Sequence, residues 1–323
     1  MTGYRAPRWL PGGHAQTIYP LLIKPAPPPY RRERWQTPDG DFIDLDWAGP
    51  PATAGSLGGT PLLILFHGLE GSSRSHYAIA LMNACAAVGW TGVVVHFRGC
   101  SGELNRLPRA YHSGDSAEID WILRRLQLLF PQAARYAVGV SLGGNALLKW
   151  LGEQGTGAVE SLRAAAAVSA PLDLSVSGHH LARGCNRVYT RHFLQTLKRK
   201  AAAKLRHHPG LFDERRMRAA RNLYEFDDVV TAPLHGFAGA DDYWRRASSK
   251  PWLTGIRLPT LLLNACNDPF LPAQVLPTAS QAAAGVRREF PAEGGHVGFV
   301  AGRLPGRLDW LPQRLLHYFQ DEV

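Results

Sequence analysis

Short apolar runs alternate with helical stretches through most of this chain, and the alternation limits the folds open to it. Five runs of five or six largely apolar residues suit strands that are buried on both faces, as in a parallel sheet: 62–66, 93–97, 136–140, 164–169 and 260–264. Stretches with a helical pattern lie between most of them, near 75–88, 115–130, 143–153 and 273–284. The pattern predicts an α/β fold with a mostly parallel, doubly wound sheet.

The first part of the chain does not follow this alternation. Residues 1–31 predict an irregular N-terminal arm, because prolines between 25 and 29 lack amide donors and favour extended polyproline geometry. A hairpin follows, with one strand at 34–37, a turn at Pro38-Asp39-Gly40, and a second strand at 43–47 that alternates apolar and acidic residues. We therefore expect an N-terminal hairpin.

One gap interrupts the alternation of strands and helices. About ninety residues separate the strand that ends at Ser169 from the strand that begins at Thr260, too many for a structureless loop in a compact domain. Within the gap, apolar residues recur every fourth position and predict an amphipathic helix: Phe193, Leu197, Ala201 and Leu205. We predict that residues 174–254 form a helical cap inserted into a single domain of residues 1–323.

The segment Gly139-Val140-Ser141-Leu142-Gly143 matches the pattern G-x-S-x-G, and its surroundings matter more than the five letters. An apolar strand precedes it and a helical pattern follows it, which is the context of a nucleophile elbow. Glycines are needed there because the tight turn brings backbone segments together where a Cβ would clash. We predict that Ser141 is a catalytic nucleophile.

A serine nucleophile needs a base to take its proton and an acid to orient that base. In this kind of fold the chain order is Ser, then Asp or Glu, then His. Asp268 follows the strand at 260–264, and His296 lies in a glycine-rich loop after a short strand at 287–290. We assign them as acid and base. Asp173 stays open as an alternative acid, and His112 is a weaker alternative base because it precedes the serine.

Acyl transfer also needs donors aimed at the developing oxyanion. The strand at 62–66 runs directly into His67-Gly68-Leu69-Glu70-Gly71, a position where such folds place one donor. We assign the backbone N–H groups of Leu69 and Leu142 to the oxyanion hole. The alternative is an ordinary glycine-rich turn between a strand and a helix.

Several motifs, taken in order, resemble the YheT-like branch of the α/β-hydrolases, a group that includes fungal and animal medium-chain acyl ester hydrolases. Besides the serine elbow with Gly143-Gly144-Asn145, they are Gly13-His14-Ala15-Gln16-Thr17, His67-Gly68-Leu69-Glu70-Gly71, Phe97-Arg98-Gly99, His112-Ser113-Gly114-Asp115, Asn267-Asp268-Pro269 and Gly295-His296-Val297-Gly298.

The resemblance implies an α/β-hydrolase fold, a triad of Ser141, Asp268 and His296, and hydrolysis of carboxylic esters, with some relatives passing the acyl group to an alcohol. It also implies that His14, Gln16, His112 and Asp115 are typical of the family without giving them a mechanism. Asp115 is well placed as the N-cap of the helix at 115–130.

The formal charge of +10 comes from one segment, since residues 183–221 carry twelve Lys or Arg against two acids. Two interpretations stay open: a solvated helical face of the cap, or a weak contact with anionic membrane surfaces. We predict no nucleic-acid partner, because no recognition module accompanies the charge.

The four cysteines are far apart and have no metal-ligand spacing. Acyl-enzyme chemistry needs neither a metal nor an organic cofactor, and we expect none. No secretory signal or long apolar run is evident, and we expect a soluble, cytoplasmic protein. The predicted function is that of a serine carboxylesterase acting on short- to medium-chain acyl esters. Alternatives are an acyltransferase that forms esters with alcohols and a catalytically silent binding protein with the same fold.

Overall fold

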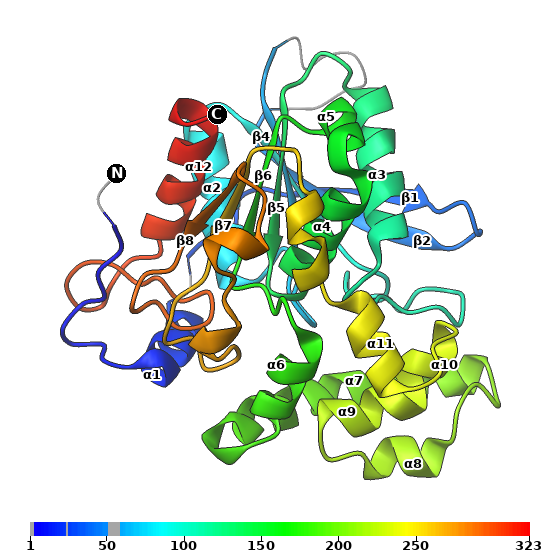
Figure 1. The fold of residues 1–323 in the computed structure, drawn as a ribbon. Coiled ribbons are helices and arrows are strands. Elements are labelled where there is room, and N and C mark those ends of the chain that lie inside the picture. Colours follow the sequence, from blue (N-terminus) through cyan, green and yellow to red (C-terminus); the bar gives the residue numbers. More distant parts are fainter. Residues whose placement is uncertain (1–2, 24, 51–58) are drawn as a thin grey trace.

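A computed structural model describes residues 3–23, 25–50 and 59–323 of the chain (Figure 1). Its centre is an eight-stranded sheet with the order β1-β2-β4-β3-β5-β6-β7-β8. All neighbours from β4 to β8 in this order are parallel, whereas β2 is antiparallel to both β1 and β4. The predicted parallel sheet and N-terminal hairpin are confirmed. The strands are β1 (Arg31–Gln36), β2 (Phe42–Ala48), β3 (Leu62–Phe66), β4 (Thr91–Val95), β5 (Arg135–Val140), β6 (Ala164–Val168), β7 (Thr260–Leu263) and β8 (Val286–Glu289).

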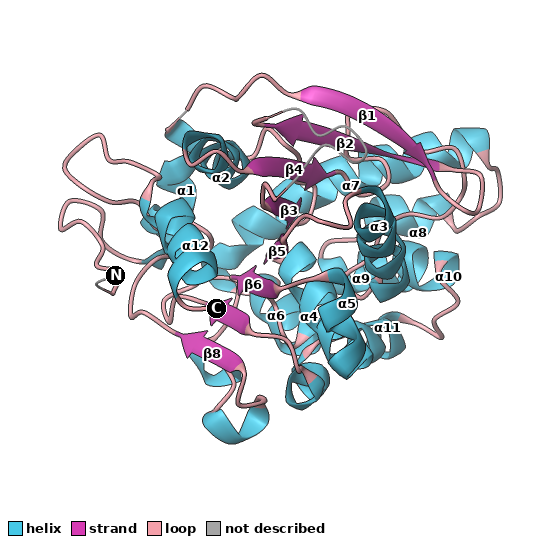
Figure 2. Ribbon diagram, turned by 90° about the horizontal axis from the view of Figure 1, so that it is seen from above, coloured by secondary structure: helices cyan, strands magenta, loops and turns pink. Residues whose placement is uncertain are grey.

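Helices cover both faces of the sheet, as the view from above shows (Figure 2). One face carries α2 (His76–Ala87) and α12 (Trp310–Asp321), and the other carries α3 (Ser116–Leu129), α4 (Leu142–Gln154) and α5 (Ala158–Ser161). The side chains of β3 alternate between the two cores: Leu62, Ile64 and Phe66 face α3 and α4, and Leu63 and Leu65 face α2 and α12. Burial on both faces explains the uninterrupted apolar run.

Several elements differ from the sequence prediction. The first strand of the hairpin, β1, spans Arg31–Gln36 instead of 34–37. β4 ends at Val95 instead of continuing to Phe97, whose amide donates a hydrogen bond to the His67 ring (3.1 Å) rather than to a strand. The predicted helix at 273–284 is wrong, because only the 3₁₀ turns η6 (Ala273–Val275) and η7 (Ala279–Gln281) form there. Pro277 has no amide hydrogen, and the residue before it is extended, with ψ 135°; both effects end a helix.

Residues 174–254, between β6 and β7, are largely helical and lie beyond the carboxyl ends of the strands (Figure 1). Two small apolar clusters hold the helices together, one around Met217 and Phe226 and the other around Trp244. We call this segment the cap. It contains α6 (Leu174–Leu181), η3 (Gly184–Asn186), α7 (Arg187–His207), α8 (Glu214–Ala219), α9 (Leu223–Phe226), the π-helical turn η4 (Asp227–Thr231), α10 (Ala232–Leu234) and α11 (Ala240–Ala247), and η5 (Lys250–Gly255) leads back to β7.

The N-terminal arm is more regular than predicted. It forms α1 (Gly13–Ile18) and a 3₁₀ turn, η1 (Tyr19–Leu22). The helix packs against the loop that follows β8 so closely that a Cβ at Gly298 would lie 2.0 Å from the Gln16 carbonyl oxygen. Residues 1, 2 and 24 of the predicted arm lie outside the described residues.

Candidate active site

Ser141 lies in the turn between β5 and α4, with φ 52° and ψ −118°. L-amino acids rarely adopt this conformation. Glycines make the turn sterically feasible: a Cβ at Gly139 would lie 2.5 Å from the Gly143 carbonyl oxygen, and a Cβ at Gly143 would lie 2.4 Å from that of Phe66. The strained turn therefore presents the serine hydroxyl at the carboxyl edge of the sheet.

His296 and Asp268 come from the loops after β8 and β7. The Nε2 atom of His296 is 3.0 Å from Ser141 Oγ, and its Nδ1 atom is 2.8 Å from Asp268 Oδ2. An ionised carboxylate only accepts hydrogen bonds. The imidazole proton therefore belongs on Nδ1, and Nε2 is left to accept the serine proton. The structure brings the three sequence-predicted residues into one hydrogen-bonded chain.

Phe270 supports both the acid and the base. Its amide donates to Asp268 Oδ1 (2.8 Å), and its ring stacks on that of His296 with centroids 3.9 Å apart. The Asp268 side chain is fully buried, so its two hydrogen bonds fix the carboxylate. Sequence reasoning did not single out Phe270, although it directly follows the Asn267-Asp268-Pro269 motif.

The N-terminal arm also holds the loop that carries His296. Thr17 Oγ1 accepts a hydrogen bond from the His296 amide at 2.9 Å. Gln16 is fully buried, and its Oε1 accepts from the amide of Gly294 (2.8 Å) and from Nδ2 of Asn267 (3.0 Å). Residues 13–17 had no mechanism assigned from the sequence. In the structure they connect the loop that carries Asp268 with the loop that carries His296.

The predicted oxyanion donor Leu69 lies in the turn directly after β3. The amide of the preceding Gly68 donates to the hydroxyl of Tyr77 (2.9 Å), whereas within the described part of the chain the Leu69 amide has no hydrogen-bond acceptor. Leu69, Leu142 and Ser141 line the same cavity. The two backbone N–H groups remain our candidates for the oxyanion hole.

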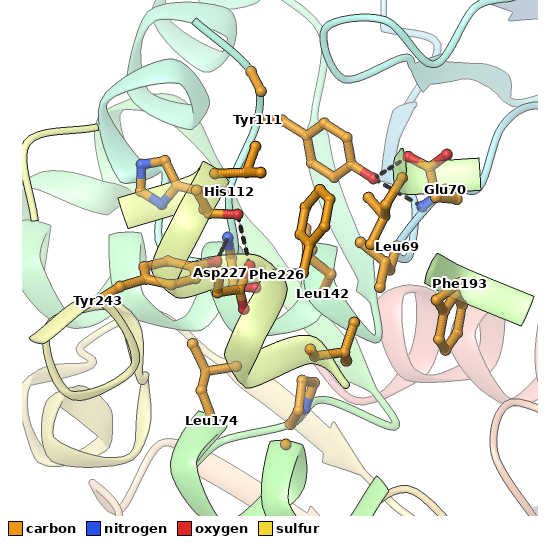
Figure 3. Close-up of a pocket in the computed structure, with 18 of the residues that line it drawn as sticks. Leu69, Glu70, Tyr111, His112, Leu142, Leu174, Phe193, Phe226, Asp227 and Tyr243 are labelled. Atoms are coloured by element: carbon orange, nitrogen blue, oxygen red, sulfur yellow. Dashed lines mark hydrogen bonds between the residues drawn. The ribbon is translucent and has the colours of Figure 1, made fainter. Parts of the chain in front are cut away.

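A buried hydrogen-bond cluster holds the other side of this turn. The Glu70 amide donates to the hydroxyl of Tyr111 (2.9 Å), and the same hydroxyl donates to Glu70 Oε1 (2.8 Å), as the dashed lines of Figure 3 show. Lys200 of α7 donates to Glu70 Oε1 as well, at 2.8 Å. The cap therefore contacts the turn that carries Leu69 and Glu70 through a charged pair.

His67 supports this turn structurally. Its Nε2 accepts a hydrogen bond from the amide of Phe97 (3.1 Å), so its proton lies on Nδ1, 2.8 Å from the Gly68 carbonyl oxygen. Desolvation by burial lowers the pKa of His67 to about 3. The ring is therefore neutral at physiological pH and fixes the backbone before Leu69.

A cavity of about 160 Å³ lies between Ser141, His296 and the cap (Figure 3). Its cap side is mostly apolar, and includes Leu174, Leu181, Phe193, Leu197, Phe226 and Val230. The charged and polar side chains in its wall include Glu70, Lys200, Lys204, His112 and Asp227. Such a cavity suits a ligand with an apolar chain and a few polar groups.

The alternative residues have other contacts. Asp173 caps α6 by accepting a hydrogen bond from the Val176 amide (3.1 Å). His112 lies in the cavity wall, where its ring contacts that of His235, and burial lowers its pKa. Asp115 occupies the N-cap position of α3, but its side chain does not cap the helix; both of its oxygens accept from Arg109 (2.7 and 2.9 Å).

In the described ranges, no group of three or more His, Cys, Asp or Glu side chains is arranged to hold a metal ion. The helices within those ranges include none with the length and apolar character needed to span a bilayer.

Comparison with known proteins places the chain in a family. The family model for the alpha/beta hydrolase fold matches residues 61–302. The Escherichia coli (strain K12) protein named "Putative esterase YheT" is 44% identical over 306 residues, which cover 94% of this chain and 88% of that protein. The chain belongs to the YheT-like α/β-hydrolases. The resemblance inferred from the motifs is confirmed.

A more distant relative and a solved structure also carry the names of hydrolytic enzymes. Human phospholipase ABHD3 is 29% identical over 321 residues, which cover 98% of this chain and 78% of that one. Among solved structures, the Pyrococcus furiosus esterase Pf2001 aligns with a TM-score of 0.58 at 13% identity, over 92% of this chain and 98% of that one. This last likeness supports the fold alone.

Proposed function

We propose that this YheT-like hydrolase is a serine carboxylic ester hydrolase that acts through an acyl-enzyme on short- to medium-chain acyl esters. The observation that carries the proposal is the 3.0 Å contact between His296 Nε2 and Ser141 Oγ, continued to Asp268 and placed beside an apolar cavity. The names of the relatives, an esterase and a phospholipase, favour ester cleavage.

In the acylation step, Ser141 Oγ attacks the ester carbonyl carbon while His296 Nε2 takes the hydroxyl proton. Asp268 stabilises the resulting imidazolium through Nδ1. The carbonyl oxygen becomes an oxyanion held by the Leu69 and Leu142 amides, each worth on the order of 3 kcal/mol to the transition state. Collapse of the intermediate breaks the ester C–O bond, and His296 returns the proton to the leaving alcohol.

In the deacylation step, water attacks the acyl-enzyme as His296 takes a proton from it. The second tetrahedral intermediate uses the same oxyanion donors. Its collapse releases the carboxylic acid and returns the proton to Ser141 Oγ. The chain's own residues supply every proton transfer in both steps.

The test compares hydrolysis of p-nitrophenyl esters, from acetate to palmitate, by the wild type and by Ser141→Ala and Asp268→Asn. We expect Ser141→Ala to abolish turnover and the activity to be highest with short and medium acyl chains. Near-wild-type activity of Ser141→Ala would refute the proposal. Ethanol in the assay separates hydrolysis from acyl transfer, because transfer would yield ethyl esters in place of the free acid.

A further inference from the structure

The wall of the cavity contains a carboxylate, that of Asp227, which has no cationic partner among the described residues. Two acidic residues line the cavity, Glu70 and Asp227, and Glu70 is paired with Lys200. Among residues 3–23, 25–50 and 59–323, Asp227 accepts hydrogen bonds only from neutral groups, the Thr231 hydroxyl (2.6 Å) and the Trp244 indole N–H (2.8 Å). Within the described residues it takes part in no salt bridge.

Several fully buried acids of the molecule lie beside a guanidinium. Asp41 is 3.2 Å from the guanidinium of Arg98, and Asp44 is 2.7 Å from that of Arg34. Removing a carboxylate from water without a compensating cation costs free energy. For Asp227 the cost is visible as a pKa that desolvation raises to about 6. A carboxylate kept at this cost in the wall of a cavity is a candidate for ligand binding.

The position of Asp227 also indicates a role in binding. It begins the π-helical turn η4, a form that is rare and often found at functional sites. Figure 3 shows it between Tyr243 and Leu142, away from the Glu70 side of the cavity. Aromatic rings of Phe226, Tyr243 and Trp244 belong to the same wall. A wall that combines a carboxylate with aromatic rings suits a cationic group, which rings attract through their faces.

We propose that Asp227 is a substrate-recognition residue that binds a protonated amine carried by the ester, at a distance from the carbonyl that Ser141 attacks. Each carboxylate oxygen accepts one hydrogen bond in the structure and has capacity for another. The inference rests on the proposed esterase function and specifies its substrate class: amphiphilic esters with a basic nitrogen.

The test uses isosteric ester pairs in which one carbon is replaced by a protonated nitrogen. On the alcohol side, butyrate esters of 3-dimethylaminopropanol and 4-methylpentanol are compared. On the acyl side, the methyl esters of 6-dimethylaminohexanoate and 7-methyloctanoate are compared. Tertiary amines are chosen because they cannot take the acyl group irreversibly. Acid release is followed by titration at pH 8, above the pKa of Asp227.

We expect the wild type to prefer the amine ester of at least one pair by about tenfold in kcat/KM, the size of a hydrogen bond to a charged group. Asp227→Asn should abolish that preference while it still hydrolyses the carbon esters. Asp228→Asn is the matched control, because Asp228 pairs with Arg216 outside the cavity; it should keep the preference.

Equal kcat/KM values within both pairs for the wild type would overturn the inference, whatever the folding of the variants. A preference that survives in Asp227→Asn would also overturn it. A wild type that hydrolyses none of the four esters, nor p-nitrophenyl butyrate, would instead contradict the proposed esterase function.

Discussion

The ammonium of Lys200 lies 2.8 Å from Oε1 of Glu70, a contact that joins the cap to the turn that carries Leu69 across 130 residues of sequence. Glu70 is the neighbour of Leu69, and its backbone has the left-handed φ of 56°. Its side chain is only 8% exposed, so removal of the lysine would leave a buried carboxylate without its cation. The position of the Leu69 amide therefore depends on how the cap packs against this turn.

We expect Lys200→Met to lower kcat for p-nitrophenyl butyrate about tenfold with a smaller change in KM, because a displaced oxyanion donor weakens the transition state more than the ground state. Lys200→Arg should recover most of the loss. Lys198→Met is the control, since Lys198 bonds only to carbonyl oxygens of the cap. Equal effects of the two Met variants on kcat would show that Lys200 acts only through cap stability.

Thr17→Val should lower kcat about fivefold, because the His296 amide loses its acceptor and the imidazole loses part of its fixed orientation. Thr17→Ser keeps the hydroxyl and should stay near the wild type. Steady-state kinetics with p-nitrophenyl butyrate measure the difference. An active Thr17→Val enzyme with unchanged kcat would mean that Gln16 and Asn267 hold the loop without help from the arm's threonine.

Asp227 should make the stability of the protein depend on pH. Its pKa rises from 3.8 in the unfolded chain to about 6 in the folded protein. Between these values the folded state binds a proton that the unfolded state has lost, so this contribution to the free energy of unfolding falls as the pH rises through the window and is constant above it. In urea unfolding from pH 4 to 8, the free energy of unfolding of the wild type relative to that of Asp227→Asn should fall up to about pH 6 and stay constant above it. Parallel curves would contradict the raised pKa.

Gly143→Ala should destabilise the protein by at least about 2 kcal/mol, since the new Cβ would meet the backbone of Phe66 at 2.4 Å and backbone cannot move aside cheaply. Gly285→Ala is the matched control, because the nearest atom there, a carbonyl oxygen of Leu258, is 3.8 Å away. Chemical denaturation gives both free energies of unfolding. A stable Gly143→Ala protein would show that the turn between β5 and α4 can move away from Phe66 to accommodate a Cβ.

The sheet and the chain order of Ser141, Asp268 and His296 could be predicted because they rest on local patterns. Buried strands are apolar throughout, and loops at their carboxyl ends meet at one edge of the sheet. The helix predicted at 273–284 failed for a local reason as well, since Pro277 outweighed the apolar spacing.

The supports of the site could not be predicted in the same way. Thr17 and His296 are 279 residues apart, and the arm that joins them has no periodic pattern. Lys200 and Lys204 belong to the basic segment at 183–221, yet both turn inward, and Lys204 donates to Asn105 (2.8 Å). Charge counting does not distinguish them from the nine basic residues of the segment that are exposed. The nine exposed residues are compatible with both interpretations of the basic cap, a solvated face or a contact with anionic membrane surfaces. Both interpretations stay predictions.

Activation of Ser141 by His296 is the step on which the proposed mechanism depends most. A fluorophosphonate probe, followed by peptide mass spectrometry, tests it directly, because the probe reacts only with an activated serine and leaves a stable adduct. We predict a single adduct on the peptide that contains Ser141 in the wild type, and labelling that is at least about a hundredfold slower in His296→Ala. An unlabelled wild type, a label on another residue, or equal labelling of His296→Ala would contradict the account.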